Sequence, residues 1–154
     1  MPKIDPAKAP RAEGTRYPEP FDVPCRNRSW LKLGDAAQLT QFGVNLVSLP
    51  PGAWSSQRHW HTHEDEFLYV LSGEVVLLTD AGEELLRAGD SAGFKAGVPD
   101  GHCLQNRSSD EARILVIGSR ITEDQGEYSD IDMIFTPGRY SGRGAFRHKD
   151  GRPY

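Results

Sequence analysis

The sequence lacks long apolar runs and contains little cysteine. No segment approaches the roughly 18 apolar residues needed to span a bilayer, and the first residues, MPKIDPAKAPRAEG, hold no apolar core of a signal peptide. The two cysteines, Cys25 and Cys103, do not make a disulfide framework. We therefore expect a cytoplasmic protein with no membrane partner.

An excess of basic residues is also absent. The chain has 18 Lys and Arg residues against 22 Asp and Glu residues, which gives a formal net charge of −4 at pH 7. Nothing in this balance points to nucleic acid as a partner. With 154 residues, the chain can bury the core of one domain but is too short for two ordinary ones.

The two ends differ in composition from the middle. Residues 1–24 contain six prolines. Because proline fixes φ and removes a backbone donor, we expect an extended arm that is neither helix nor central strand. Residues 121–154 are first acidic and then rich in glycine and arginine. We expect this C-terminal extension to pack on the main domain or on a partner subunit through Tyr140, Phe146 and Tyr154.

Residues 25–120 form the predicted main domain, in which short apolar segments alternate with turns. β-Branched and aromatic residues are bounded by Gly, Pro and Asp at intervals of about ten residues, which is typical of an all-β sandwich or barrel. The strand-like segments are LTQFGVNLVSL (39–49), EFLYVL (66–71), EVVLLT (74–79), EELLR (83–87), SAGFK (91–95), HCLQN (102–106) and ARILVIGS (112–119).

Three histidines, His59, His61 and His63, stand at alternate positions before an acidic stretch. Because alternate residues of an extended strand point to one face, their imidazoles project together. Two imidazoles at i and i+2 can both reach one metal ion at about 2.0–2.1 Å. The alternative is an exposed edge strand on which histidine serves only as a polar residue. We favour His59 and His61 as ligands and expect His63, at the strand end, to be exposed or only near the site.

A carboxylate is available at the start of the apolar segment EFLYVL. Glu66 begins this segment, and both faces of the segment are apolar beyond it, which predicts a central strand buried on both sides with the acid at its mouth. Glu64 and Asp65 fall in the turn before the strand, where we expect them to be solvated. Glu66 is therefore the carboxylate that we expect in a metal site.

A further imidazole opens another strand-like segment. If His102 points inward, Cys103 points to the opposite face, so we expect Cys103 to be a small buried hydrophobe rather than a ligand or nucleophile. Trp60 has the opposite parity to His59 and His61, and we expect it to pack between layers or at a dimer contact.

These segments resemble the cupin superfamily over residues 50–118. The first cupin motif is a glycine, a spacer, His-x-His, three or four residues, Glu, six residues and Gly, and it is matched by Gly52, His59-Trp60-His61, Glu66 and Gly73. The second motif resembles GDSAGFKAGVPDGHCLQN, which departs from it in two places. Lys95 replaces the motif proline, and His102 comes two residues late, so that Asp100 stands at the motif histidine's place.

The resemblance implies a double-stranded β-helix, or jelly-roll, barrel with a metal inside its mouth, usually in a homodimer. The implied ligands are His59, His61, Glu66 and His102, with Asp100 as an alternative oxygen ligand. More narrowly, the chain resembles small single-domain bacterial cupins that are grouped with sugar-phosphate isomerases. Fold alone does not decide the chemistry of such a site.

Three histidines and one glutamate are compatible with Zn, Fe, Mn, Ni or Co. Such an ion can orient a small oxygenated molecule, for example a sugar, a sugar phosphate or an organic acid. We expect a metal-dependent enzyme, with isomerisation the first choice and Glu66 or His63 as a base. The alternatives are a non-heme iron dioxygenase and a non-catalytic sensor that only binds a small molecule. Lys95, beside the site loop, is a cation that can meet a carboxylate or phosphate.

Overall fold

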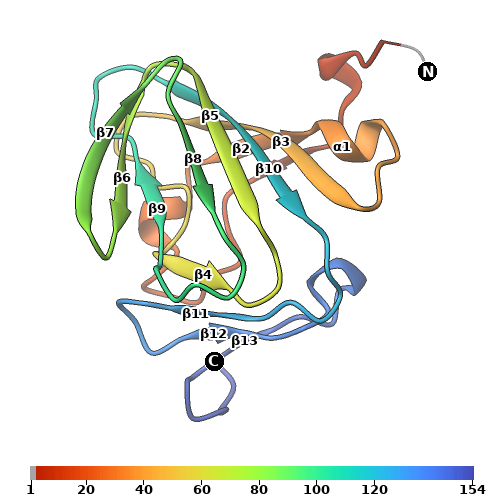
Figure 1. The fold of residues 1–154 in the computed structure, drawn as a ribbon, viewed down its shortest axis with the longest axis vertical. Coiled ribbons are helices and arrows are strands. Elements are labelled where there is room, and N and C mark those ends of the chain that lie inside the picture. Colours follow the sequence, from red (N-terminus) through yellow and green to blue (C-terminus); the bar gives the residue numbers. More distant parts are fainter. Residues whose placement is uncertain (1–2) are drawn as a thin grey trace.

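The structure of the protein, a computed structural model, describes residues 3–154. Within that range its regular secondary structure is almost entirely antiparallel β-strand. A six-stranded sheet, the first, faces a four-stranded and a three-stranded sheet, which are together called the second sheet (Figure 1). The prediction of an all-β jelly-roll barrel is confirmed. The helical elements are short: α1 (Leu33–Ala36) and the 3-10 turns η1 (Pro6–Lys8), η2 (Val23–Cys25) and η3 (Arg139–Ser141). None of these helices is long and apolar enough to cross a membrane.

The first sheet contains six strands in the order β1-β2-β3-β10-β5-β8. Its central strand, β10, pairs with β3 on one side and with β5 on the other. The bounds are β1 (Arg11–Glu13), β2 (Ser29–Lys32), β3 (Phe42–Leu49), β10 (Ala112–Ser119), β5 (Glu66–Ser72) and β8 (Ser91–Phe94). The proline-rich N-terminal segment contributes β1, which lies at the edge of the sheet, where proline-rich sequence is tolerated.

The second sheet begins with β7-β6-β9 and continues through β4 into the C-terminal strands. A bridge between His59 and His102 joins β9 to β4, after which β11, β12 and β13 follow in order. Figure 1 shows these last strands below the barrel, at the end opposite the N-terminus. The bounds are β7 (Gly82–Arg87), β6 (Glu74–Thr79), β9 (Cys103–Gln105), β4 (His59–His61), β11 (Gly126–Tyr128), β12 (Ile134–Phe135) and β13 (Phe146–Arg147).

The hydrophobic core fills the space between the two sheets. Strands β5 and β10 contribute Leu68, Val70 and Ile114, each at most 1% exposed, and the second sheet contributes Leu77 and Leu104. Full burial of one such side chain stabilises the fold by about 1.5–3 kcal/mol. The core therefore fixes which face of each strand points inward, and with it the direction of the site residues at the strand ends.

The outer face of β5 differs from the prediction that this strand is buried on both sides. The strand is central in its sheet, but its outward side chains are exposed: Phe67 by 43%, Tyr69 by 39% and Leu71 by 48%. The prediction that EFLYVL is buried on both sides is therefore wrong for a single chain. No described segment of the chain packs over these three side chains closely enough to bury them.

A second, smaller apolar cluster ties the ends of the chain to the barrel. Tyr128, Met133 and Phe135 are buried, and Tyr17 and Phe146 pack against them. The ring centroids of Tyr17 and Phe146 lie 5.2 Å apart, so the two terminal segments contact each other directly. The division of the chain into an arm at 1–24, a barrel at 25–120 and an extension at 121–154 stays a prediction.

Candidate metal centre

The four ligands predicted from the sequence lie close together at one end of the barrel. Strand β4 presents His59 and His61 on one face, and the Nε2 atoms of these residues are 3.2 Å apart. Glu66 opens β5, and its Oε2 lies 3.8 Å from His61 Nε2 and 3.8 Å from His102 Nε2. The backbone of His102 pairs with His59, which brings the two rings to a centroid distance of 5.1 Å. The structure thus brings all four side chains together; their role as ligands stays a prediction.

Hydrogen bonds on the far side of two rings fix their protonation pattern. His59 Nδ1 donates to the Gln57 carbonyl at 3.0 Å, because a carbonyl oxygen can only accept. His61 Nδ1 donates to Asp124 Oδ2 at 2.7 Å. In a neutral imidazole the other nitrogen is then an unprotonated acceptor. The two Nε2 atoms face each other across 3.2 Å, where one proton or one metal ion can be shared by both rings.

The pKa shifts favour the protonation states that a metal requires. Burial, and then the neighbouring His61 and His102, hold the pKa of His59 well below its usual value, so His59 is neutral at neutral pH. Burial alone would raise the pKa of Glu66, but the facing imidazole of His102 and then His61 lower it to about 2. A neutral imidazole and an ionised carboxylate are the forms that bind a metal ion.

His102 is the most unusual member of the group. Its side chain is buried, and neither Nδ1 nor Nε2 has a hydrogen-bond partner within residues 3–154. One face of the ring stacks on Phe94, with centroids 3.6 Å apart and an interplanar angle of 4°. A buried imidazole without a partner carries a desolvation cost that a bound ion would remove.

The residues fit a metal ion by this test. Two nitrogens, each about 2.1 Å from one ion at roughly 100°, would lie about 3.2 Å apart, as the two Nε2 atoms do. His59, His61 and Glu66 offer ligand atoms that all lie within 4.8 Å of one another. A single cation at this point would meet both Nε2 atoms and an ionised carboxylate. The unpartnered His102 lies beside this group, with its Nε2 3.8 Å from Glu66 Oε2.

A cavity of about 220 Å³ lies beside this cluster. It is lined by Trp60, His61, Glu64, Gly93, Phe94, Lys95, Val98, Asp100 and His102. Lys95 is the single Lys or Arg of this lining, and it forms no ion pair with any residue of 3–154. Asp100 Oδ1 accepts a hydrogen bond from the Asp80 amide at 2.7 Å, so one of its oxygens is already engaged.

Of two predictions for residues next to the cluster, the one for His63 agrees with the structure and the one for Glu64 does not. His63 is exposed and its Nδ1 contacts Thr62 Oγ1 at 2.7 Å, in agreement with a place outside the cluster. Glu64, however, is not solvated: it is 4% exposed and accepts hydrogen bonds from the Ile121 amide and the Tyr140 hydroxyl, each at 2.8 Å. It also forms an ion pair with Arg139. The turn is covered by the C-terminal extension, and for this reason local turn chemistry predicted the wrong environment.

Sequence reasoning also missed Asp124, which is 2% exposed and binds His61. The only signal for it is the acidic segment ITEDQGE (121–127), in which nothing separates a buried aspartate from solvated neighbours. Cys103 is buried without a bond to the cluster, as expected. Trp60, expected to pack between layers or at a dimer contact, is half-buried and also lines the cavity beside the histidines. Arg58, which precedes β4, pairs with Asp80 and Asp130.

The structure is a jelly-roll barrel with histidines and a carboxylate at one end. Comparisons with known families and solved structures give the same class of fold. The cupin domain family matches residues 45–118. A crystal structure described as a sugar phosphate isomerase from a cupin superfamily, from Silicibacter pomeroyi, is 46% identical, with a TM-score of 0.93 over 99% of this chain and 96% of that one. The chain belongs to the cupin superfamily.

Other solved structures are more distant. A candidate sugar phosphate isomerase from Acidithiobacillus ferrooxidans is 27% identical, with a TM-score of 0.74 over 83% of this chain and 80% of that one. The polyketide cyclase RemF from Streptomyces resistomycificus is 20% identical, with a TM-score of 0.63 over 77% and 79%. RemF shows likeness of fold alone. A comparison with curated protein sequences gives no match.

Proposed function

We propose that this cupin is a metal-dependent enzyme that isomerises a small phosphorylated sugar. The observation that carries the proposal is the pair of Nε2 atoms of His59 and His61, 3.2 Å apart, with both Nδ1 atoms committed to other partners. Two similar solved structures are described as sugar phosphate isomerases, one of them as a candidate, and this supports the substrate class.

The chain would hold a divalent metal through His59, His61, Glu66 and His102. When bound, such an ion supplies Lewis-acid polarisation of a carbonyl or hydroxyl oxygen. The ligand set does not select among Zn, Fe, Mn, Ni and Co. Phe94, stacked on His102, and the half-buried Trp60 give the cavity part of its apolar lining.

Lys95 is the residue to which we assign the phosphate group. It is the one cation of the cavity lining, and it has no carboxylate partner among the described residues. The nearby Arg139 is unsuitable, because it is already paired with the buried Glu64. A lysine ammonium binds phosphate as a point charge. The substrate would therefore lie between Lys95 and the histidine cluster.

Proton transfer is assigned to Asp100. Isomerisation needs a group that removes the proton next to a carbonyl. With a pKa of about 2, Glu66 is a weak base, and His63 does not line the cavity. Both carboxylate oxygens of Glu64 are engaged by Arg139, Tyr140 or Ile121. Asp100 Oδ2 has no hydrogen-bond partner within residues 3–154.

The test combines elemental analysis of untagged protein with an isomerase assay on a panel of sugar phosphates and the same sugars without phosphate. We expect stoichiometric metal and turnover of a phosphorylated member. Lys95→Ala should raise KM for that substrate at least about tenfold, the scale of one lost charge-assisted contact, while Lys95→Arg keeps most of the affinity. Asp100→Asn should lower kcat with metal content unchanged.

Other outcomes would overturn the proposal. Metal-free wild-type protein, even after incubation with Zn, Fe, Mn, Ni and Co in turn, removes its basis. Oxygen consumption with iron-loaded protein would identify a dioxygenase instead. Tight binding of a sugar phosphate with no turnover would identify a sensor.

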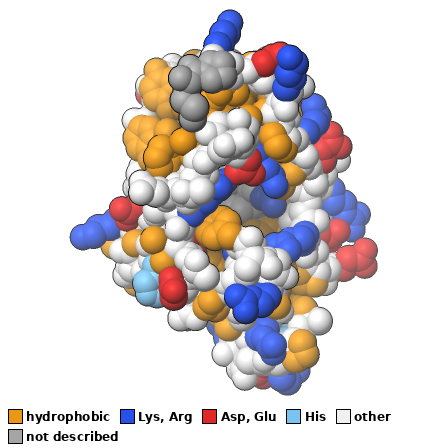
Figure 2. Space-filling model, turned by 90° about the vertical axis from the view of Figure 1, so that its right-hand side faces the viewer, with side chains coloured by type: hydrophobic (Ala, Val, Ile, Leu, Met, Phe, Trp, Pro, Cys, Tyr) orange, Lys and Arg blue, Asp and Glu red, His pale blue; other side chains and the backbone are white. Residues whose placement is uncertain are grey.

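We also propose that the protein is a homodimer that associates through the outer face of the first sheet. Phe67 and Tyr69 of β5 are paired across the sheet with Ile117 and Leu115 of β10, so these four side chains share that face. Phe42, 41% exposed, extends the patch at the start of β3. Figure 2 shows hydrophobic side chains grouped in the upper part of the face it presents, with Lys and Arg side chains spread over that face from top to bottom. Exposed apolar patches of this kind mark interaction sites.

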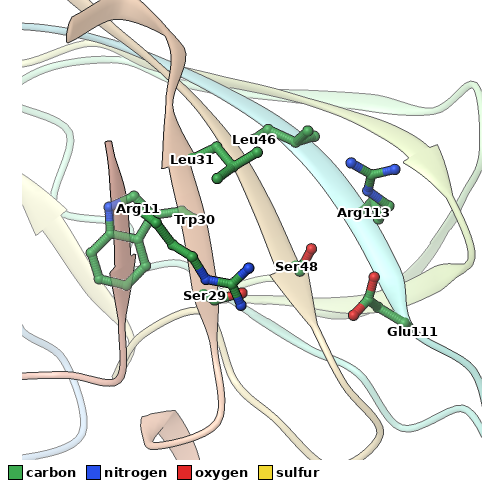
Figure 3. Close-up of a pocket in the computed structure, with 8 residues that line it drawn as sticks. All are labelled: Arg11, Ser29, Trp30, Leu31, Leu46, Ser48, Glu111 and Arg113. Carbon is green, nitrogen blue, oxygen red and sulfur yellow. The ribbon is translucent and has the colours of Figure 1, made fainter. Parts of the chain in front are cut away.

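The charges beside the patch favour a second copy as the partner. A groove of about 210 Å³ crosses this sheet, and Figure 3 shows Arg11 on one side of it and Arg113 with Glu111 on the other, with Ser48 between them. Arg113 and Glu111 form no ion pair with residues 3–154. In a two-fold arrangement each residue meets the same surface of the partner, so Arg113 of one copy can pair with Glu111 of the other.

Sedimentation velocity tests this interface. Phe67→Glu should convert the dimer to a monomer, whereas Leu85→Glu, a matched change at a 39% exposed leucine on β7 of the other sheet, should leave the dimer intact. Arg113→Glu should weaken the dimer, and the added Glu111→Arg change should restore it. A monomeric wild type, or a dimer that survives Phe67→Glu, would overturn this assignment.

A further inference from the structure

A buried polar system lies beside the candidate metal centre, and one of its members, Glu64, also lines the cavity. It joins His61 to residues of the C-terminal extension, which follows the segment matched by the cupin family. Asp124 and Glu64 are 2% and 4% exposed, so two carboxylates are buried beside one imidazole. Carboxylates are seldom buried unless they are paired or hydrogen-bonded, and here each is engaged on both oxygens.

Asp124 uses its two oxygens for two different tasks. Oδ2 accepts the Nδ1 proton of His61 at 2.7 Å, and Oδ1 accepts the backbone amide of His63 at 3.0 Å. The first contact sets the ring orientation and tautomer of His61, and the second holds the carboxylate relative to β4. An imidazole whose Nδ1 is committed in this way presents its Nε2 lone pair toward the cluster.

Asp124 is itself held in place by a chain of contacts. Its backbone amide donates to the Ile121 carbonyl at 3.1 Å, and the Ile121 amide donates to Glu64 Oε1 at 2.8 Å. Glu64 is fixed in turn by the Tyr140 hydroxyl at 2.8 Å and by the Arg139 guanidinium. The turn η3 therefore fastens the segment that carries Asp124 to the barrel.

We propose that Asp124 is a positioning residue for the metal centre and that Arg139 supports it through Glu64. The C-terminal extension then completes the site rather than only covering the barrel. The expected effect on metal binding rests on the proposed function, whereas the expected effect on the tautomer of His61 does not. That tautomer can be measured in protein to which no metal has been added.

The first experiment uses ¹⁵N NMR of the metal-free protein with labelled histidine. In the wild type we expect His61 to be the Nδ1–H tautomer, and in Asp124→Ala we expect it to shift toward the usual Nε2–H form. Asp130→Asn is the control, because Asp130 also accepts hydrogen bonds from a side chain next to β4, that of Arg58, but has no hydrogen bond to the cluster. Unchanged His61 shifts in Asp124→Ala would overturn the inference whether or not the protein binds metal.

The second experiment titrates the protein with Co²⁺ and follows affinity and the visible absorption of the complex. Loss of a residue that orients a ligand typically costs about 10–100-fold in metal affinity, so we expect that loss in Asp124→Ala and a smaller one in Asp124→Asn. An asparagine can accept only one of the two hydrogen bonds. Arg139→Gln should also weaken binding, and Arg139→Lys should restore part of it.

The outcomes separate the two proposals. If the wild type binds no Co²⁺, the proposed function is contradicted. If His61 nevertheless loses the Nδ1–H tautomer in Asp124→Ala, the positioning role is supported. A wild type that binds Co²⁺ with the same affinity and spectrum as folded Asp124→Ala supports the function and overturns the positioning role. Wild-type behaviour of Arg139→Gln in both experiments would overturn the part assigned to Arg139.

Discussion

His59 and His61 direct their Nε2 atoms toward each other at 3.2 Å, although each ring already donates its Nδ1 proton elsewhere. Two imidazole nitrogens in this arrangement repel unless a proton or a metal ion lies between them. Their shared face follows from the alternation of β4, and their protonation follows from Gln57 and Asp124. The cluster therefore offers two nitrogens from one strand to a shared ion, as the proposed metal site requires.

Replacement of His61 by alanine should abolish stoichiometric metal binding, because it removes the proposed ligand whose Nε2 lies 3.2 Å from His59 Nε2 and 3.8 Å from Glu66 Oε2. His63→Ala, which removes an exposed imidazole two residues away, should bind metal as the wild type does. The measurement is metal content by elemental analysis of untagged protein after dialysis. Equal metal content in the two variants would contradict the assignment of His61.

The site was predictable from sequence as far as strand alternation and motif spacing reach. His59, His61 and Glu66 lie within eight positions of one another, and the alternation of β4 brings the histidines together. His102 required the bridge between β4 and β9, which the motif resemblance supplied in spite of its altered spacing. Asp124 and Arg139 reach the site only through tertiary packing of the C-terminal extension, and no local pattern marks them.

Gly126 should tolerate no side chain, because β11 pairs with β4 there without space for one. A Cβ at this position would overlap the Trp60 carbonyl oxygen and lie 2.6 Å from Phe135 Cε1. Since the oxygen belongs to the backbone, the strands themselves must move. We expect Gly126→Ala to lower the free energy of unfolding by about 2–3 kcal/mol, the upper range for overpacking. Chemical denaturation measures this change.

Gly93→Ala is the matched control for that experiment. Gly93 also lies in a strand, β8, but a Cβ there would come no closer than 3.9 Å to any neighbour. We expect a change of less than about 1 kcal/mol, within the range of ordinary strand propensity. Similar destabilisation by both substitutions would show that the loss of a glycine itself, rather than the close pairing of β11 with β4, causes the loss of stability.

The fold was more predictable than the surfaces. Segments such as EFLYVL and ARILVIGS fall on β5 and β10, because β-branched and aromatic runs bounded by turn residues specify strands. The same runs could not show which apolar face is covered, since Leu68 and Phe67 differ only in parity. Burial by a second subunit leaves the same sequence pattern as burial within one chain.

The two cysteines should resist modification in the folded protein. Burial raises the pKa of Cys25 to about 11, and burial also raises the pKa of Cys103 to about 12. Because the thiolate is the reactive form, neither should be labelled at pH 8 by a thiol reagent. Addition of denaturant should expose two thiols per chain. Rapid labelling of native protein would contradict the buried positions.

The same shifts predict a loss of stability at alkaline pH. The thiol of Cys103 ionises near pH 8.5 in an unfolded chain but only near its raised pKa of about 12 in the folded one. The contribution is fully present below about pH 8.5, and it decreases as the pH rises toward 12 because only the unfolded state releases the proton. Above pH 9, each buried thiol should lower the free energy of unfolding by about 1 kcal/mol per pH unit. Urea unfolding between pH 8 and pH 10 should therefore give a shallower decline for Cys103→Ala than for the wild type, whatever constant offset the smaller side chain causes. Parallel declines would mean that the Cys103 thiol ionises as readily in the folded barrel as in the unfolded chain.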